Sequence, residues 1–381
     1  MLNAWRIASG GALCLAAALL VLGAAPVRAA GVLDGLHHHA LLASTVPDNG
    51  DLNPYAVVVA PVSAGKIHKG DVLVDNFNNQ SNLQGTGATI VIVNPATRSV
   101  RLFAKLPQKL PQCPGGIGLT AAMTMLRGGW VIAGSTPSTD GTTATKGAGC
   151  LLVFDANGRL TTIWKGSRIN GPWGNLAVSD QGASATLFVS MSGFDVPGPD
   201  KRDAKTGEPI VVHEATVLRI ELAVPKNGPP KVTGQTVVAS GFAQSADKDA
   251  FLIGPTGLAL VGGTLYVSDA IENRIVAVPD ALTRTDSAGT GRTVTKDGLL
   301  RRPLAMAVAA NGHLLVANAK NGQVVEFDPA SGKQLGARWL DADQAQSPPG
   351  NGDLFGIAMK TDGSGFYYVE DDVNTLMAAA K

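Results

Sequence analysis

Asparagine and aspartate side chains near the ends of short apolar runs are the first candidates for chemistry in this sequence. Asn53, Asn175, Asp269 and Asp353 all occupy such positions. Carboxylate and amide oxygens suit a hard cation. The same side chains also accept hydrogen bonds from backbone N–H groups in their own turns, which is the simpler interpretation. Asp269 and Asp353 are therefore candidate metal ligands if the fold brings such oxygens together.

Aromatic residues stand at the beginning of three apolar runs. Tyr55, Trp173 and Phe355 could form a stacking surface beside the amides of Asn53 and Asn175. Aromatic side chains at such positions also fill hydrophobic cores. We take all five as candidate ligand-binding residues.

Other catalytic patterns are weak. His37, His38 and His39 are adjacent, and on an extended strand only the first and third would share a face. No serine lies in a Gly-x-Ser-x-Gly elbow. The Gly-x-Gly motifs at 85–87 and 116–118 precede no helical pattern. Motifs alone therefore assign no reaction.

The composition indicates short strands and excludes some partners. Charged residues make up 16% of the 381 residues, and there are 46 glycines and 22 prolines. Typical soluble proteins contain roughly 25% charged residues. The 31 basic and 30 acidic side chains almost balance, so no net field steers the protein toward nucleic acid.

The elements that must position the candidate residues form a repeat. Residues 257–279 contain two short runs joined at Gly262-Gly263, the two-residue turn of a β-hairpin, and a third run that would pair back. Similar strand ends recur at 74–76, 132–134, 189–191, 316–318 and 369–371. This spacing, about 50 to 80 residues, is typical of propeller blades with loop insertions.

Counting the predicted strands indicates a closed ring. Residues 55–381 provide one strand fewer than six four-stranded units need, and Ala40–Val46 is the strand left over. Pairing it with Asn374–Ala379 would complete the last unit and protect its edge. We predict an all-β fold, a six-bladed β-propeller whose last blade is closed by the N-terminal strand.

The best-formed unit resembles an NHL repeat. Pro255, Val267-Ser268-Asp269 and Asn273-Arg274-Ile275 carry the resemblance, and looser copies lie at 316–324 and 369–376. Gly134 and Met191 depart from the pattern. NHL propellers include interaction scaffolds and gluconolactonase-like hydrolases and lyases, so the resemblance implies a fold and no single function. Propeller lactonases hold calcium in the central tunnel, which makes calcium the cofactor to test here.

The first thirty residues are typical of a secretory signal peptide. Arg6 precedes an apolar stretch at 12–22, and small residues follow at Ala29 and Ala30. Its removal would leave residues 31–381 as one domain without a membrane span, in the periplasm or secreted. Export supplies an oxidising environment, so we predict a disulfide between Cys113 and Cys150.

Strand order places most of the long connections on one face of the predicted ring, here called the long-loop face. They are residues 78–87, 106–118, 135–149, 192–213, 241–254 and 341–353. Long loops on a rigid scaffold usually carry function. We predict a monomeric binding scaffold that takes a small molecule or a protein on this face, around the tunnel mouth. The alternative is a calcium-dependent lactone hydrolase or lyase of the gluconolactonase-like type.

Overall fold

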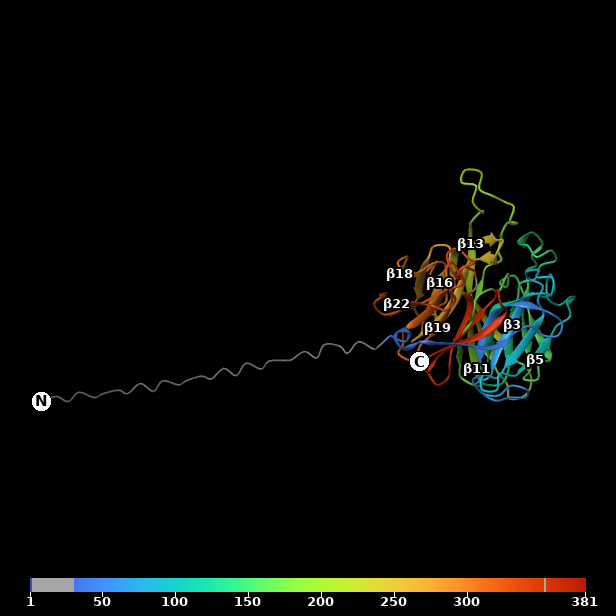
Figure 1. Cartoon of the computed structure of the whole chain (residues 1–381), viewed down its shortest axis with the longest axis horizontal. Coiled ribbons are helices and arrows are strands. Elements are labelled where there is room, and N and C mark those ends of the chain that lie inside the picture. The colour runs from blue at the N-terminus through green and yellow to red at the C-terminus, as the bar shows by residue number, and fades with distance from the viewer. Residues whose placement is uncertain (2–30, 353) are drawn as a thin grey trace. The chain divides into compact units, whose positions relative to one another are not determined.

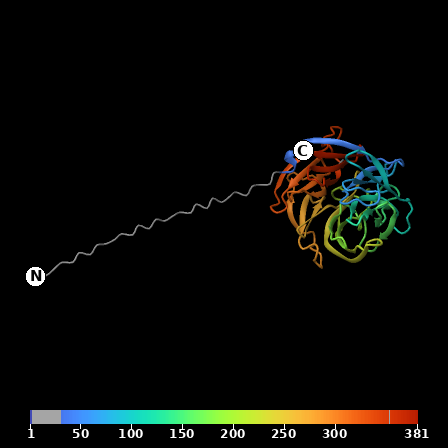
Figure 2. The ribbon, with the colours of Figure 1, turned by 90° about the horizontal axis from the view of Figure 1, so that it is seen from below.

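Six antiparallel sheets stand around a central axis and confirm the predicted β-propeller (Figures 1 and 2). The computed structural model describes Met1, residues 31–352 and residues 354–381. Residues 2–30 of the predicted signal peptide and Asp353 therefore lie outside the described residues. Residues 31–381 form one compact unit.

The first three blades follow one another along the chain. Blade 1 contains β2 (Leu52–Val59), β3 (Val72–Asn78), β4 (Thr89–Val93) and β5 (Val100–Lys105). Blade 2 contains β6 (Leu119–Met125), β7 (Val131–Ser135), β8 (Cys150–Phe154) and β9 (Leu160–Trp164). Blade 3 contains β10 (Ala177–Asp180), β11 (Ser184–Met191), β12 (Val212–Ala223), β13 (Lys231–Asp247) and an additional strand, β14 (Phe251–Ile253).

The remaining blades complete the ring. Blade 4 contains β15 (Pro255–Val261), β16 (Thr264–Asp269), β17 (Arg274–Val278) and β18 (Arg292–Lys296). Blade 5 contains β19 (Pro303–Val308), β20 (Leu314–Asn318), β21 (Gln323–Phe327) and β22 (Gln334–Trp339). Blade 6 contains β23 (Leu354–Met359), β24 (Gly365–Glu370), β25 (Thr375–Ala380) and β1 (His38–Ser44). Two short 3-10 helices are η1 (Leu33–Gly35) and η2 (Thr143–Thr145).

The N-terminal strand closes the ring as predicted. β1 pairs antiparallel with β25, with His38 opposite Ala380 and Ser44 opposite Thr375. The blue strand lies beside the red C-terminal strand in Figure 2. The observed strand starts two residues before the predicted Ala40–Val46. Because β1 pairs with β25, the last blade has four strands, like its two neighbours.

Small residues let the innermost strands approach one another. A methyl group on Gly174, Gly257 or Gly356 would lie 1.6, 2.2 or 2.3 Å from a backbone carbonyl oxygen of the next blade. Such a distance is far inside van der Waals contact. Glycine at these positions therefore sets the diameter of the central tunnel.

The predicted disulfide is confirmed. Cys113, in the connection before β6, bonds to Cys150 at the start of β8, and both are buried. The sequence separation of 37 residues corresponds to a stabilisation of about 4 kcal/mol in the chain-entropy estimate. Within the described part of the chain, no helix is long and apolar enough to cross a bilayer.

The closure predicts what truncation does. Deleting residues 31–46 removes β1 together with the buried Leu33 and Leu36, so it exposes the edge of β25 and the surface against which the two leucines pack. The midpoint of thermal unfolding and the solubility should therefore fall. Burial of each leucine contributes about 1.5–3 kcal/mol, so the free energy of unfolding should fall by several kcal/mol. Calorimetry measures this change, and a synthetic peptide of residues 31–46 should restore part of it. Unchanged thermal stability in the truncated chain would refute the closure.

Candidate functional site

An aromatic plug fills the tunnel mouth on the long-loop face. It consists of Tyr55, Phe77, Trp173, Phe251 and Phe355, of which none is more than 4% exposed. The Tyr55 ring stacks on Phe355 with centroids 3.9 Å apart and on Phe77 at 4.5 Å. Trp173 lies 5.5 Å from Phe77 and 6.0 Å from Phe251. These rings meet one another at the axis and leave almost no face open to solvent.

Three members of the plug occupy equivalent positions in their blades. Tyr55, Trp173 and Phe355 each immediately precede the small residue, Ala56, Gly174 or Gly356, at which innermost strands approach. Because side chains alternate along a strand, this register directs all three rings to the axis. Aromatic pairs of this geometry contribute about 0.5–1.5 kcal/mol beyond their buried area. The predicted aromatic residues therefore pack as a core, and ligand contact by them stays a prediction that would require the plug to open.

A hairpin of blade 3 covers the plug. This axial hairpin, residues 245–253, pairs Ser245–Asp247 with β14 and brings Phe251 to the axis. On one side, Gln84 Nε2 donates to the carbonyl oxygen of Asp249 at 2.7 Å. On another side, Arg302 Nη1 lies 2.8 Å from Asp247 Oδ2. Loops of blades 1 and 5 thus hold the hairpin across the mouth.

Asp247 holds this cover in place. Its Oδ1 accepts hydrogen bonds from the backbone N–H groups of Asp249 and Ala250, both at 2.9 Å. Burial alone would raise the pKa of Asp247. The Ala250 N–H and the Arg302 guanidinium outweigh it and hold the pKa below its ordinary value. The carboxylate therefore stays ionised and keeps the ion pair with Arg302.

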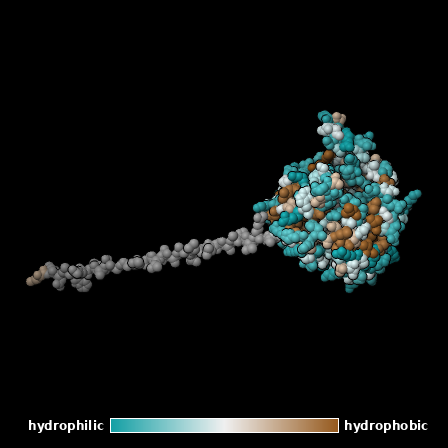
Figure 3. All heavy atoms as spheres, viewed as in Figure 1, coloured by the Kyte–Doolittle hydropathy of each residue, from teal (hydrophilic) through white to brown (hydrophobic). Residues whose placement is uncertain are grey.

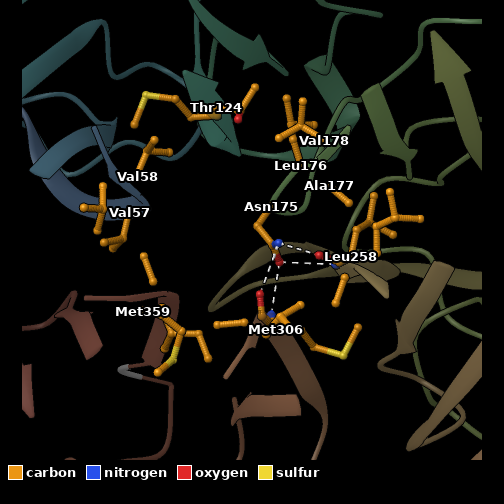
Figure 4. Close-up of a pocket in the computed structure, with 18 residues that line it drawn as sticks. Val57, Val58, Thr124, Asn175, Leu176, Ala177, Val178, Leu258, Met306 and Met359 are labelled. Carbon is orange, nitrogen blue, oxygen red and sulfur yellow. Dashed lines mark hydrogen bonds between the residues drawn. The ribbon is translucent and has the colours of Figure 1, made fainter. Parts of the chain in front are cut away.

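Asn175 lies below the plug and braces three blades (Figure 4). Its Nδ2 donates to the carbonyl oxygens of Leu258 at 2.9 Å and Met306 at 3.4 Å. Its Oδ1 accepts from the N–H groups of the same residues at 3.3 and 3.1 Å. The amide is fully used by backbone partners. Asn175 therefore braces the segment before β10 against strands β15 and β19, and its predicted role in ligand binding stays a prediction.

Beneath Asn175 a cavity opens on the face opposite the long loops. Its volume is about 310 Å³, and all six innermost strands contribute to it. Apolar side chains dominate the wall, as Figure 4 shows for Val57, Leu176 and Met359. None of its lining residues is charged.

The predicted metal ligands do not converge in the described residues. Asp269 is buried and its Oδ2 pairs with Nη2 and Nε of Arg274 at 2.8 and 2.9 Å. Burial nevertheless raises the pKa of Asp269. The N–H of Asn53 donates to Asn374 Oδ1 at 2.6 Å, so Asn53 belongs to the junction between blades 1 and 6. Asp353 lies outside the described residues.

The described residues do not by themselves show a calcium site. Among the residues that the structure describes, no group of three or more His, Cys, Asp or Glu side chains could hold a metal ion. A calcium ion takes six to eight oxygen ligands at 2.3–2.6 Å. Calcium also accepts amide and backbone oxygens, so calcium binding stays a prediction.

An open hollow of the long-loop face lies beside the plug, and we call it the side pocket. Its volume is about 420 Å³. Three sources form it: the long β11–β12 connection that projects from blade 3 in Figure 1, the axial hairpin, and loops of blades 4 and 5. The lining residues are Glu208, Pro209, Val211, Ser245, Ala246, Asp247, Ile253, Ala270, Ile271, Asn273, Arg301, Arg302 and Lys320.

Cationic groups and an apolar wall meet in the side pocket. Arg302 is fixed by Asp247, and Arg301 Nη1 donates to the carbonyl oxygens of Gly298 and Leu300 at 2.7 and 2.6 Å. Lys320 takes part in none of the ion pairs found in the described chain. Ile253 and Ile271 supply apolar surface. With Arg302 paired to Asp247, the cations Arg301 and Lys320 outnumber the one remaining carboxylate, Glu208, so the arrangement suits an anionic molecule with an apolar portion.

A smaller cavity of about 80 Å³ extends inward from the side pocket. It shares Asp247, Arg302 and Lys320 with the side pocket and adds Asn351 and Phe355. The buried Asn351 Oδ1 has no hydrogen-bond partner among the described residues. Phe355 is therefore a predicted ligand-binding residue that lies beside this cavity.

The sequence did not single out the cationic residues of this pocket. Arg301 and Arg302 immediately precede Pro303, the first residue of β19, and Lys320 follows the strand-end Asn318. Their positions at the long-loop ends of an innermost and a second strand were a usable signal. Nothing in the sequence showed that the axial hairpin would fold toward them.

A buried acid lies next to the plug. Asp75 is fully buried, and its Oδ1 accepts the N–H of Ala56 at 2.8 Å. Ser190 and Ser268 do the same for Gly174 and Gly257 at 3.0 and 2.5 Å. Asp75 thus replaces a serine that caps the innermost strand. Burial raises the pKa of Asp75 to about 8, so the side chain is neutral at pH 7.

No family model matches this chain, and no curated protein matches its sequence. Solved structures do match its fold. A gluconolactonase from Xanthomonas campestris superposes with a TM-score of 0.52 at 14% identity, over 91% of this chain and 94% of that protein. The PQQ-bound aldose sugar dehydrogenase from Streptomyces coelicolor gives 0.52 at 15% identity, over 90% and 97%. Regucalcin from Agrobacterium tumefaciens, a calcium-binding protein, gives 0.50 at 14% identity, over 88% and 92%.

These comparisons support a propeller fold of the gluconolactonase and regucalcin type. At such low identity they establish the fold alone, and propellers host unrelated activities. The assignment of the repeats to the NHL family stays a prediction.

Asp75 predicts a specific pH dependence of stability. Its pKa is raised in the folded state, so between about pH 4 and pH 8 the unfolded chain releases a proton that the folded chain keeps. Stability should therefore fall as pH rises, by about 1.4 kcal/mol per pH unit for this group. Asp75→Asn removes this contribution. Urea unfolding at pH 5 and pH 8 should show the variant gaining several kcal/mol relative to the unmodified protein at the higher pH. Equal pH dependence in the two proteins would show that Asp75 ionises normally.

Proposed function

We propose that this protein is an exported β-propeller that binds a small organic anion in the side pocket. The observation that carries the proposal is the cationic hollow beside a closed tunnel mouth. Its volume of about 420 Å³ falls within the roughly 300–1,000 Å³ range of ligand pockets. The ligand site then lies on the predicted long-loop face but off the axis.

The lining residues indicate the chemistry of the ligand. Lys320 and Arg301 offer positive charge for a carboxylate or phosphate, and charge-assisted hydrogen bonds of this kind are the strong ones. Asn351 Oδ1 is a buried acceptor without a partner in the described chain, so it suits a hydroxyl group of the ligand. Ile253 and Ile271 cover the carbon skeleton. Hydroxy acids, including sugar acids, combine these features.

The confirmed disulfide supports export. A buried bond between Cys113 and Cys150 is typical of a periplasmic or secreted protein, in agreement with the signal peptide predicted at 1–30. The proposal treats the mature protein as a monomer that does not bind nucleic acid. The alternative ligand within the scaffold hypothesis is a protein that binds the long-loop face.

Lactone hydrolysis is the second candidate, and the comparisons favour it over a scaffold. The supporting observation is the shared fold with a gluconolactonase and with calcium-binding regucalcin. For that activity the axial hairpin and the plug would have to move aside and expose oxygen ligands. Asp269, predicted as such a ligand, would also have to leave Arg274.

Removing the cation from the side pocket tests the binding proposal. Lys320→Ala should weaken binding of gluconate or glucuronate about tenfold, because a hydrogen bond between charged groups contributes roughly 1.5–3 kcal/mol. Isothermal titration calorimetry measures the affinity, and added salt should reduce it. Lys333→Ala, in the exposed turn at the opposite end of blade 5, is the charge-matched control. Equal binding by the Lys320 variant, or no binding of any organic anion in a panel, would exclude the site.

Calcium distinguishes the two functions. The binding proposal expects no change in the unfolding temperature between 1 mM calcium and excess chelator, and no hydrolysis of D-glucono-1,5-lactone. The lactonase hypothesis expects calcium to raise the unfolding temperature by mass action and to support turnover. Saturable calcium binding together with calcium-dependent hydrolysis would replace our first proposal with the second.

A further inference from the structure

The first described residues after Met1 are seated between blades 5 and 6. Leu33 and Leu36 are buried and pack in one cluster with Leu315, Leu340 and Tyr368. The segment leads directly into β1, the strand that closes the ring. Whatever holds this segment therefore also holds the closure.

Glu326 anchors the segment from β21. Its side chain is buried at 1% exposure, and Oε2 accepts the N–H of Leu33 at 3.0 Å. Oε1 lies 2.6 Å from His313 Nδ1 and accepts from Asn311 Nδ2 at 3.3 Å. Burial raises the pKa of Glu326, but the N–H of Leu33 and the contact with His313 outweigh it and lower the pKa below its ordinary value. Glu326 is therefore an ionised carboxylate at neutral pH.

Gly31 lies against this carboxylate and against Asp34. A methyl group on its Cα would lie 2.9 Å from Asp34 Oδ2 and 3.1 Å from Glu326 Oε2. The nitrogen of Gly31 is bonded to the same Cα, so it lies within roughly 6 Å of both oxygens. In an uncleaved chain this nitrogen is a neutral amide. Two carboxylates thus lie near the position where a free amine would carry a positive charge.

We propose that cleavage of the Ala30–Gly31 bond is coupled to closure of the ring, because Asp34 and Glu326 capture the new α-ammonium group of Gly31. Hydrolysis adds the hydroxyl of water to the carbonyl carbon of Ala30 and a proton to the nitrogen of Gly31. A second proton from solvent then gives the ammonium. An exporting signal peptidase supplies the catalyst. The inference rests on the predicted signal peptide and is independent of the ligand proposed above.

Other charged groups lie around the two carboxylates. Arg338 Nε donates to the carbonyl oxygen of Leu33 at 3.3 Å, and the alkyl chain of Lys381 lies against Gly35. His313 contacts Glu326, and Asp328 lies behind His313. Nearby opposite charge favours the charged form of an amine. The captured ammonium group therefore stabilises the folded chain fully below the ordinary amine pKa of about 7.7–8.0. This contribution is lost as pH rises through the higher pKa that the amine has in the folded chain.

Chains with chemically different first residues test the capture. We would compare residues 31–381 carrying a free Gly31 amine with the same chain acetylated at Gly31, each with and without Asp34→Asn. Acetylation should raise the unfolding equilibrium constant about three- to tenfold at pH 7, and the effect should shrink at pH 10. In the Asp34→Asn chain it should be smaller. Asp48→Asn, an exposed carboxylate in the loop after β1, is the matched control and should leave the acetylation effect unchanged.

Two results would overturn the inference. One is equal stability of the acetylated and free-amine chains at pH 7. The other is an intact mass of the exported full-length protein that shows a mature chain beginning anywhere other than Gly31. A mass that begins at Gly31, with a stability difference that depends on Asp34, supports the capture.

Discussion

Six innermost strands converge on one axis, and the space they enclose must be filled or covered. Gly174, Gly257 and Gly356 allow the strands to approach until a methyl group would collide with the next blade. The side chain of the residue before each of these contact positions points to the axis. In three blades that residue is Tyr55, Trp173 or Phe355. Close packing of these rings is the constraint from which the rest of the structure follows.

The filled axis decides where a ligand can bind. Phe251 completes the plug from the axial hairpin, and Gln84 and Arg302 hold that hairpin in place. The same Arg302 forms a wall of the side pocket, so the cover of the tunnel and the candidate site share one ion pair. The side pocket therefore lies beside the axis and shares Arg302 with the cover of the tunnel mouth.

The fold is compatible with an enzyme, whereas the residues at the axis of this chain favour binding beside it. Solved structures of the same fold include a gluconolactonase, a calcium-binding protein and a PQQ-bound dehydrogenase, so the scaffold hosts several chemistries. In this chain the axial positions hold aromatic rings, and Asp269 is committed to Arg274. The enzymatic alternative therefore requires a rearrangement, whereas anion binding uses the groups as they stand.

The sequence was sufficient for the ring and its closure because both follow from local patterns. Alternating apolar residues, two-residue turns and one unpaired strand specified six blades and the pairing of β1 with β25. The placement of Cys113 and Cys150 in the same unit was likewise enough for the disulfide. The candidate site depended on long-range contacts instead. Phe251 lay in what the sequence showed as a long loop, and Asn175 reaches two other blades through backbone groups that no motif reports.

Crystallography of the mature protein with calcium and gluconate tests the account most directly. We expect the rings of Tyr55, Trp173, Phe251 and Phe355 to remain stacked at the axis. Gluconate should lie in the side pocket, with its carboxylate at Lys320 and Arg301. Calcium bound at the axis, with the axial hairpin displaced and Trp173 and Phe355 turned away, would contradict the account and establish the tunnel mouth as the site.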